Sequence, residues 1–205
     1  MILCDIGNTT VDIYENAICR KVALLEFYPE LLIGDVWYAC VNSSVQEKIS
    51  FLGNWQDIGL LIDREKYYPT MGIDRILVCE AIEEGVIVDA GSAITVDVMK
   101  KGIYEGGFIT LGLKSAQEAY AKLSHALDVS FNFEVDLAKM AKNTPDAVTT
   151  GFVAPLVEKI VRLGNPIYIC GGDSAQLSHF LPNSIIDREL VFKGMIKLIN
   201  RDRKC

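Results

Sequence analysis

One pattern occurs twice in this chain, first as Met1-Ile-Leu-Cys-Asp-Ile-Gly-Asn-Thr-Thr-Val-Asp12 and again as Val86-Ile-Val-Asp-Ala-Gly-Ser-Ala-Ile-Thr-Val-Asp97. In both copies an apolar run leads into Asp-x-Gly, small residues follow, and the stretch ends in Thr-Val-Asp. The two leading aspartates, Asp5 and Asp89, are 84 positions apart. This self-similarity predicts that the chain is a duplication of one structural unit.

Each copy of the pattern is typical of a strand, a tight turn and a second strand. The apolar run has the length of a buried strand, and Gly7 and Gly91 allow the backbone to turn and approach a ligand closely. Hydroxyl, amide and backbone N–H donors follow at Asn8, Thr9, Ser92 and Thr95. Such turns can bind phosphate oxygens, and Asp5 and Asp89 can bind a hydrated cation beside them. The alternative is two ordinary hairpins, because a short motif alone is weak evidence.

Composition narrows the possible classes of protein. The 205 residues are 50% hydrophobic and carry a formal net charge of −7. That length suffices for one large domain or two of about 100 residues each, and the duplication favours two. The negative charge argues against nucleic acid as a main partner, because phosphate backbones select basic surfaces.

The cysteines and the hydrophobic runs bear on location. Six cysteines occur, with no Cys-x-x-Cys pair and no Cys/His cluster of zinc spacing. This usage predicts reduced, buried thiols and a cytoplasmic protein. No apolar run reaches ~18 residues and the N-terminus has no basic region of a signal peptide, so no membrane partner is expected.

The order of the predicted elements indicates an α/β fold. Strands alternate with helices and hairpins along the whole chain. We place the first unit at residues 1–85 and the second at 86–205. Glycine turns at the strand ends put polar groups at one edge of each sheet, so two such units facing each other would form a cleft.

Three segments before the second copy of the pattern matter for the site. Gly59 to Ile62 is predicted to be a short strand, and residues 63–71, which contain Tyr67-Tyr68-Pro69, a loop. Gly72-Ile73-Asp74-Arg75 then opens a helix. On a regular helix consecutive side chains diverge by about 100°, so Asp74 and Arg75 should point in different directions.

Two helices are predicted in the second half. Thr144 is expected to be the N-cap of a helix that carries Pro145 in its first turn and runs to about Leu163. The segment from Glu189 to Leu198 should form the last helix, followed by a basic tail.

Together the motifs resemble type III pantothenate kinase, a bacterial enzyme of the acetate and sugar kinase, Hsp70 and actin superfamily. The resemblance covers essentially the whole chain in order, and the combination is more specific than any single piece. The matching pieces are DIGNTTVD (5–12), GIDR (72–75), DAGSAITVD (89–97), YEGGFITLG (104–112), NTPDAVTTG (143–151) and GGD (171–173). The resemblance implies that the two units are actin-like, ribonuclease H-like domains.

The resemblance also implies a reaction and its cofactors. The family transfers the γ-phosphoryl group of ATP to pantothenate, which gives 4'-phosphopantothenate in the first step of coenzyme A biosynthesis. The implied phosphate-binding residues are Asp5, Ile6, Gly7, Asn8, Thr9, Thr10, Val11 and Asp12, with Ser92 as a second contact. Mg²⁺ would accompany ATP near Asp5, and Asp89 would bind a monovalent cation, K⁺ or NH₄⁺.

Asp74 is our candidate for the general base. A carboxylate of ordinary pKa about 4 is a weak base toward an alcohol, so its main role would be to orient the hydroxyl and accept the proton late. The alternative is an aspartate favoured at a helix N-terminus by the helix dipole. Arg75 could contact the pantothenate carboxylate, hold a loop or form a surface ion pair.

The remaining implied contacts belong to pantothenate. Gly72, Ile73, Asp74 and Arg75 would bind it, together with a tyrosine. Tyr68 is the candidate and Tyr67 the alternative. Thr144 would reach pantothenate from the partner subunit of a homodimer.

Two other functions stay open at this point. The chain could be a regulatory nucleotide-binding protein on the same scaffold, as some relatives are described as accessory factors for transcription. It could also be a kinase of the same superfamily for another alcohol or acid, because a fold does not fix its substrate.

Overall fold

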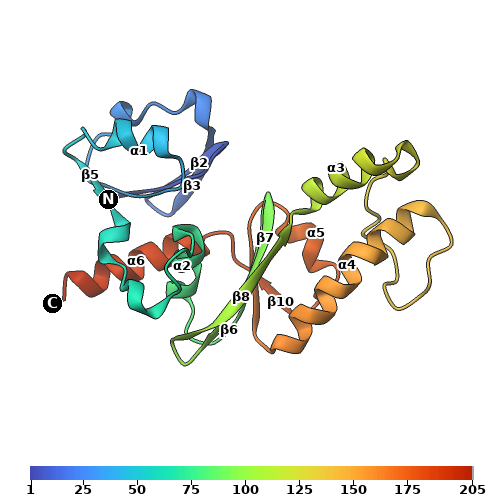
Figure 1. The fold of residues 1–205 in the computed structure, drawn as a ribbon. Coiled ribbons are helices and arrows are strands. Elements are labelled where there is room, and N and C mark those ends of the chain that lie inside the picture. Colours follow the sequence, from blue (N-terminus) through green and yellow to red (C-terminus); the bar gives the residue numbers. More distant parts are fainter. Residues whose placement is uncertain (205) are drawn as a thin grey trace. The chain divides into compact units, whose positions relative to one another are not determined.

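The computed structural model describes residues 1–204, which divide into two compact units. Unit 1 comprises Met1–Ile82 and the segment that starts at Glu189, and unit 2 comprises Glu83–Arg188. Both units combine a mixed sheet with helices, as Figure 1 shows, so the predicted α/β class is confirmed.

Unit 1 is built on a sheet with strand order β3-β2-β1-β4-β5. Its strands are β1 (Ile2–Ile6), β2 (Thr10–Glu15), β3 (Ile18–Ala23), β4 (Val36–Cys40) and β5 (Trp55–Asp57). Its α-helices are α1 (Ser43–Ile49), α2 (Ile73–Ala81) and α6 (Leu190–Asp202). Short 3₁₀ turns connect them: η1 (Leu24–Glu26), η2 (Pro29–Leu31), η3 (Ile58–Leu61) and η4 (Arg64–Lys66).

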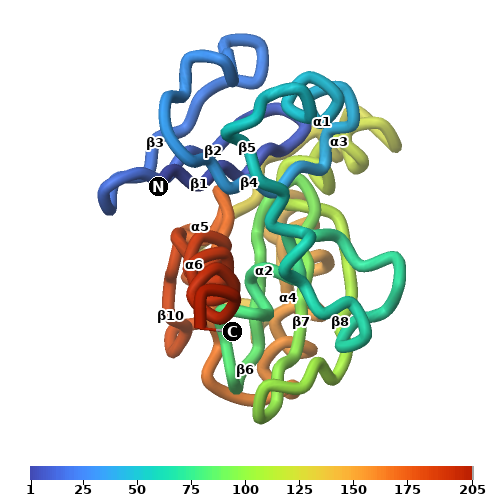
Figure 2. The backbone as a smooth tube through the Cα atoms, turned by 90° about the vertical axis from the view of Figure 1, so that its left-hand side faces the viewer, coloured from blue at the N-terminus to red at the C-terminus, as the bar shows by residue number. Residues whose placement is uncertain are grey.

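Alternation along β1 and β2 divides the first sheet into two apolar faces. Cys4, Ile6 and Val11 on one face join a buried cluster with Ile49 of α1. The opposite face meets α6, where Tyr14 and Phe192 stack with ring centroids 5.1 Å apart. Helix α6 lies beside α2, as both Figure 1 and Figure 2 show. The first sheet is therefore covered on both sides.

Unit 2 repeats the arrangement of unit 1. Its strands are β6 (Gly85–Ala90), β7 (Ala93–Lys100), β8 (Ile103–Leu111), β9 (Ile167–Cys170) and β10 (Ser184–Ile186), in the order β10-β9-β6-β7-β8. When unit 2 is read from the β8 edge, its order β8-β7-β6-β9-β10 corresponds strand for strand to β3-β2-β1-β4-β5 of unit 1. β1 and β6 each have an antiparallel hairpin partner on one side and a parallel strand on the other. The predicted duplication is confirmed.

Helices and a long connection complete unit 2. The helical elements are α3 (Leu113–Leu123), η5 (His125–Leu127), α4 (Thr144–Leu163) and α5 (Ser174–Ser178). Val88 and Val96 of the sheet share a buried cluster with Leu156 and Ile160 of α4, which runs along this face in Figure 1. The 20 residues of α4 begin at Thr144 and end at Leu163, close to the predicted bounds.

One predicted strand is wrong. Gly59 to Ile62 belongs to the 3₁₀ turn η3 and its end, and the strand β5 lies just before it. The cause is local, because the Asp57 side chain accepts a hydrogen bond from the Gly59 N–H at 2.7 Å. An Asx turn of this kind curls the backbone where the apolar run suggested an extended one.

The predicted division into 1–85 and 86–205 needs a correction at the C-terminus. The observed change of unit, between Ile82 and Glu83, lies close to the predicted one. Helix α6, however, packs in unit 1 rather than unit 2. The physical reason is its apolar stripe, in which Phe192, Met195 and Leu198 are almost fully buried.

Candidate active site

The first Asp-x-Gly turn joins β1 to β2. The Gly7 N–H donates to the Thr10 carbonyl at 3.0 Å, which leaves Asn8 and Thr9 at the exposed tip of the hairpin. A Cβ on Gly7 would lie 3.2 Å from that carbonyl oxygen, so glycine fits best here. The turn lies at the carboxyl end of β1 beside the parallel strand β4, where open α/β sheets bind ligands.

Asp5 and Asp12 face each other across this hairpin. They are direct cross-strand partners, so both carboxylates lie on the sheet face that also carries Tyr14. Lys21 pairs with Asp12 from the next strand, with 3.2 Å between its Nζ and the Asp12 Oδ2. Like charges directly opposite repel, and the Lys21 ammonium offsets part of that repulsion; the two carboxylates also offer oxygen atoms to a hydrated metal ion.

The second turn joins β6 to β7 and is more tightly enclosed. The Ser92 carbonyl accepts hydrogen bonds from the Gly112 N–H at 3.1 Å and from the Ser115 hydroxyl at 2.9 Å. A Cβ on Gly112 would lie 2.1 Å from the Gly91 carbonyl oxygen, so only glycine permits the contact. The start of α3 is thereby fixed against the turn, with Ser92 itself exposed.

Asp89 lies just before this turn in a setting rich in oxygen atoms. Its cross-strand partner is Thr95, whose hydroxyl is buried without a hydrogen-bond partner among the described residues. Gly171 comes so close that a Cβ would lie 2.4 Å from the Asp89 Oδ1 and from the Ala90 carbonyl oxygen. With φ at +85°, Gly171 also has a backbone conformation that other residues rarely adopt. The oxygen donors around Asp89 fit a hard cation.

The shared Thr-Val-Asp ending does not place its two aspartates in equivalent positions. Asp12 lies opposite Asp5, whereas Asp97 lies opposite Ile87, two residues before Asp89. The second copy has one more residue before this ending and a tighter turn, so the register differs. Asp97 is fully buried and accepts a hydrogen bond from the Tyr104 hydroxyl at 3.0 Å.

The motif Gly72-Ile73-Asp74-Arg75 opens α2, as predicted. Gly72 is the N-cap, and the Asp74 Oδ1 accepts a hydrogen bond from the Arg75 N–H at 2.9 Å. A Cβ on Gly72 would lie 2.5 Å from that oxygen, so the glycine makes room for the carboxylate. The helix start therefore fixes Asp74 through one of its two oxygens, as expected for an aspartate at a helix N-terminus.

Arg75 points away from Asp74 and into the protein. It is 4% exposed, its guanidinium donates to the Tyr68 hydroxyl, and its Cζ lies 5.7 Å from the centre of the Tyr68 ring. Of the roles considered from the sequence, the structure supports the one in which Arg75 holds the preceding loop. The burial argues against a plain surface ion pair.

The two adjacent tyrosines have different surroundings. Tyr67 is 7% exposed and donates its hydroxyl to the Glu80 Oε1 at 3.2 Å, while Tyr68 is 40% exposed. Burial, with the nearby charge of Glu80, raises the pKa of Tyr67 well above its usual range. Tyr68 is therefore the better placed of the two to meet a substrate.

Thr144 is not an N-cap, which corrects the prediction. The cap of α4 is Asn143, whose side chain accepts from the Asp146 N–H at 2.9 Å, and Thr144 is the first helical residue. Thr144 is exposed and lines a shallow depression together with Tyr120, Leu127 and Val148. The pattern Asn-x-x-Asp could have revealed the true cap, because Asn143 also donates to the Asp146 carboxylate at 2.7 Å.

Two further features of the described residues bear on cofactors and membranes. Among residues 1–204, no group of three histidine, cysteine or acidic side chains is placed to bind a metal without a ligand's help. A cation at Asp5 or Asp89 would thus rely on phosphate, water or backbone oxygens as well. In the same part of the chain, no helix has the length and hydropathy needed to cross a membrane.

A repeated mixed sheet, whose first strand ends in an Asp-x-Gly turn in both copies, defines a duplicated α/β protein of the actin-like class. A family model described as type III pantothenate kinase matches residues 35–165. A Sulfurimonas denitrificans protein of that name is 50% identical over 206 residues, covering 100% of both chains. One from Campylobacter hominis is 40% identical over 207 residues, covering 97% of this chain and 98% of its own. This chain therefore belongs to the type III pantothenate kinase family.

A solved structure supports the fold along the whole chain. It is that of a Campylobacter jejuni protein described as a conserved Baf family transcriptional activator. The two chains are 31% identical, the TM-score is 0.90, and 100% of each is covered. The description of that protein differs from the kinase name of the other relatives.

Proposed function

We propose that this protein transfers the γ-phosphoryl group of ATP to the primary hydroxyl of pantothenate, which yields 4'-phosphopantothenate for coenzyme A biosynthesis. The observation that carries the proposal is the pair of Asp-x-Gly turns at the ends of β1 and β6 in a chain of this family. Phosphoryl transfer needs two oxygens in line and neutralisation of spreading negative charge. Two polar turns with carboxylates beside them suit both tasks.

The first turn is our proposed main site for the ATP phosphates. Its exposed tip presents backbone N–H groups and the side chains of Asn8 and Thr9, and the residues from Asp5 to Asp12 form its hairpin. Ser92 would supply a second contact from the other turn, beside the N-terminus of α3. A helix N-terminus favours anions, which supports this assignment.

The cations of the proposed site follow from the oxygen donors. Asp5, opposite Asp12, would bind Mg²⁺ of the nucleotide through water, and Asp89 with the Thr95 hydroxyl would bind K⁺ or NH₄⁺. Such ions neutralise phosphate charge during transfer. A structure with ATP bound would test whether Asp5 and Asp89 each bind a cation in this way.

Asp74 is the proposed general base. Its Oδ1 is held by the Arg75 N–H at 2.9 Å, so the carboxylate has a fixed direction at the start of α2. A base that orients the attacking hydroxyl needs that rigidity more than it needs a high pKa. Both readings of Asp74, helix-start residue and base, are compatible because they use different oxygens.

The acceptor site would combine the start of α2 with a second chain. Tyr68, Gly72, Ile73 and Arg75 adjoin Asp74 in unit 1, where they would contact pantothenate. The exposed Thr144 would contact it from the partner subunit of a homodimer in the cytoplasm. Measuring the mass of the protein in solution tests the dimer, and Thr144→Ala should weaken pantothenate binding without weakening ATP binding.

The central experiment mixes the purified protein with ATP, Mg²⁺, K⁺ and pantothenate and measures ADP and phosphopantothenate. We expect turnover by the wild type and a loss of about 10² or more in kcat for Asp74→Asn, the scale of general base catalysis. Asp35→Asn is a matched control, because Asp35 is an exposed carboxylate elsewhere in unit 1. Equal activity of the Asp74 and Asp35 variants would remove Asp74 from the role of base.

A regulatory function is the second candidate, because the Campylobacter jejuni relative is described as a transcriptional activator. A regulator on this scaffold would bind ATP and transfer nothing to pantothenate or to another small alcohol. The same assay decides, with ATP binding measured by calorimetry. Pantothenate leading a panel of hydroxyl acceptors by more than ~10-fold in kcat/KM, or about 1.4 kcal/mol, would exclude both the regulator and a kinase for another substrate.

A further inference from the structure

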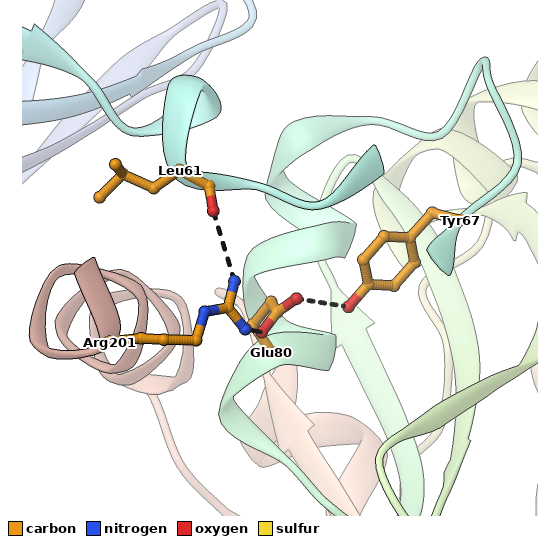
Figure 3. Close-up of polar contacts among 4 residues, drawn as sticks. All are labelled: Leu61, Tyr67, Glu80 and Arg201. Carbon is orange, nitrogen blue, oxygen red and sulfur yellow. Dashed lines mark hydrogen bonds and ion pairs between the residues drawn. The ribbon is translucent and has the colours of Figure 1, made fainter. Parts of the chain in front are cut away.

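A buried polar cluster in unit 1 lies outside the residues proposed to contact the nucleotide or pantothenate. Its centre is Glu80, which lies near the end of α2 and is 6% exposed. Figure 3 shows the Glu80 carboxylate between Tyr67 and Arg201, which approach it from different segments. Tyr67 donates to Oε1 at 3.2 Å, and the Arg201 Nη1 lies 3.4 Å from Oε2.

Arg201 extends the cluster to one more segment. Its Nη2 donates to the carbonyl of Leu61, at the end of η3, at 3.3 Å. A single carboxylate thus connects helix α2, helix α6 and both ends of the stretch from Leu61 to Tyr67. A buried carboxylate is costly unless both oxygens are hydrogen-bonded, and here both are.

The stretch that this cluster fastens leads directly to the proposed acceptor site. Tyr67 has an extended backbone, with φ at −128° and ψ at 159°. Side chains of neighbouring residues in an extended segment point to opposite sides, so the inward direction of Tyr67 sets the outward direction of Tyr68. The exposures of 7% and 40% agree with this alternation.

The two tyrosines fasten the loop to α2 at two points. Tyr67 meets Glu80 near the end of the helix, and the Tyr68 hydroxyl meets Arg75 in its first turn. Within the loop itself, the Arg64 guanidinium donates to the Met71 carbonyl at 3.3 Å, which closes the loop just before Gly72. Burial and the nearby charge of Glu80 raise the pKa of Tyr67, in keeping with a hydroxyl that holds its proton as a hydrogen-bond donor.

We infer that Tyr67 and Glu80 are positioning residues, which act through Tyr68 to fix the acceptor-binding loop against the start of α2. The inference rests on the proposed function, since the loop would bind the alcohol substrate and not the nucleotide. Weakening this cluster should therefore change the KM for pantothenate selectively.

The experiment compares Tyr67→Phe with Tyr38→Phe. Tyr38 is also buried in unit 1, at 6% exposed, but lies on β4 in the cluster that packs against α1, so its variant controls for loss of one buried hydroxyl. For Tyr67→Phe we expect the KM for pantothenate to rise about tenfold, equivalent to about 1.4 kcal/mol, with kcat and the KM for ATP within about twofold. An unchanged pantothenate KM, or a parallel change in all three constants, would overturn the inference.

A double-mutant cycle checks that Tyr67 acts through Glu80. Glu80→Gln keeps the shape but removes the charge that receives the Tyr67 hydroxyl. If the two residues work together, the pantothenate KM of Tyr67→Phe/Glu80→Gln will be far lower than independent effects predict. Independent effects would show that they do not form one positioning unit.

Limited trypsin digestion separates this inference from the proposed function. Lys66 is exposed and precedes Tyr67, so release of the loop should speed cleavage after Lys66 in Tyr67→Phe and not in Tyr38→Phe. If the wild type fails to phosphorylate pantothenate, the proposed function is wrong. The cleavage rates still test, independently of that result, whether Tyr67 holds the loop against α2. Equal cleavage rates in the two variants would overturn the fastening itself.

Discussion

Helices α2 and α6 cross at Gly194, and a single methyl group should disrupt that crossing. A Cβ on Gly194 would lie 1.9 Å from the carbonyl oxygen and 2.7 Å from the carbonyl carbon of Leu77. These are backbone atoms in the middle of α2, so no side chain can rotate away. In Gly194→Ala the two helices must therefore move apart by roughly 1 Å or more to reach ordinary contact distances.

The expected cost can be estimated from the burial around the crossing. Leu77, Phe192 and Met195 are each at most 2% exposed, so separation of the helices loosens a packed interface. Overpacking of a core costs about 1–3 kcal/mol, and a backbone obstacle belongs at the upper end. Alanine recovers about 1 kcal/mol of helix propensity over glycine. The net loss is roughly 2 kcal/mol, which lowers Tm by about 4–8 °C for a chain of this size.

Gly151 provides a matched control in α4. It is also inside a helix, but apart from its chain neighbours and the nearby backbone of that helix, no described atom lies within 4 Å of a Cβ at this position. Gly151→Ala should therefore stabilise the protein by about 1 kcal/mol from helix propensity alone. Two glycine-to-alanine substitutions are thus expected to change the free energy of unfolding in opposite directions: Gly194→Ala lowers it and Gly151→Ala raises it.

The assay is urea or thermal unfolding with two probes. Both tryptophans, Trp37 and Trp55, lie in unit 1, so their fluorescence reports the effect of Gly194→Ala. Circular dichroism of the helices reports Gly151→Ala. Wild-type stability in Gly194→Ala, or the same sign for both substitutions, would refute the reasoning from the crossing.

Four other substitutions test local parts of the structure. Asn143→Ala should cost about 0.5–2 kcal/mol, because it removes the cap of α4, whereas Thr144→Ala should cost much less in the same unfolding measurement. Gly171→Ala should cost more than about 1 kcal/mol from its positive φ alone and should weaken any K⁺ dependence of turnover, since the new methyl would displace Asp89. Burial raises the pKa of the Cys4 thiol to about 12 from its ordinary 9.0, so this thiol stabilises the folded state below about pH 9, and the stabilisation is lost as pH rises toward 12. The stability difference between wild type and Cys4→Ala should shrink over that range, and a constant difference would show that Cys4 does not titrate as described.

The parts of the fold that the sequence predicts are those set by local signals. Asp-x-Gly after an apolar run indicates a strand and a turn within a few residues, and its recurrence around Asp5 and Asp89 with similar flanking residues predicts the duplication. The glycine before Asp74 likewise marked the start of α2 correctly. The strand predicted at Gly59 failed because the Asp57 side chain competes with extended backbone there, which an apolar pattern does not reveal.

The sequence could not predict features that depend on register or on distant partners. Asp97 matched Asp12 by its neighbours, yet the tighter second turn places Thr95, not Asp97, opposite Asp89. Glu80 and Arg201 are 121 positions apart, and neither belongs to a local motif. Their pairing arises only when α6 packs beside α2, so only the structure shows that the loop before Asp74 is fastened.

Helix α6, although it lies far along the chain, packs in unit 1 and covers the second apolar face of the first sheet. The strands within residues 1–82 form a sheet with two apolar faces, and α1 covers one of them. On α6, Phe192, Met195 and Leu198 are each at most 2% exposed, and burial of such side chains is worth about 1.5–3 kcal/mol apiece. Burial of these three side chains together is therefore of the same order as the whole net stability of a typical domain, about 5–15 kcal/mol, although such burial figures are upper estimates. Unit 1 is therefore complete only when α6 has packed against α2 and Arg201 has reached Glu80, which couples the last helix of the chain to the loop that precedes the proposed catalytic aspartate.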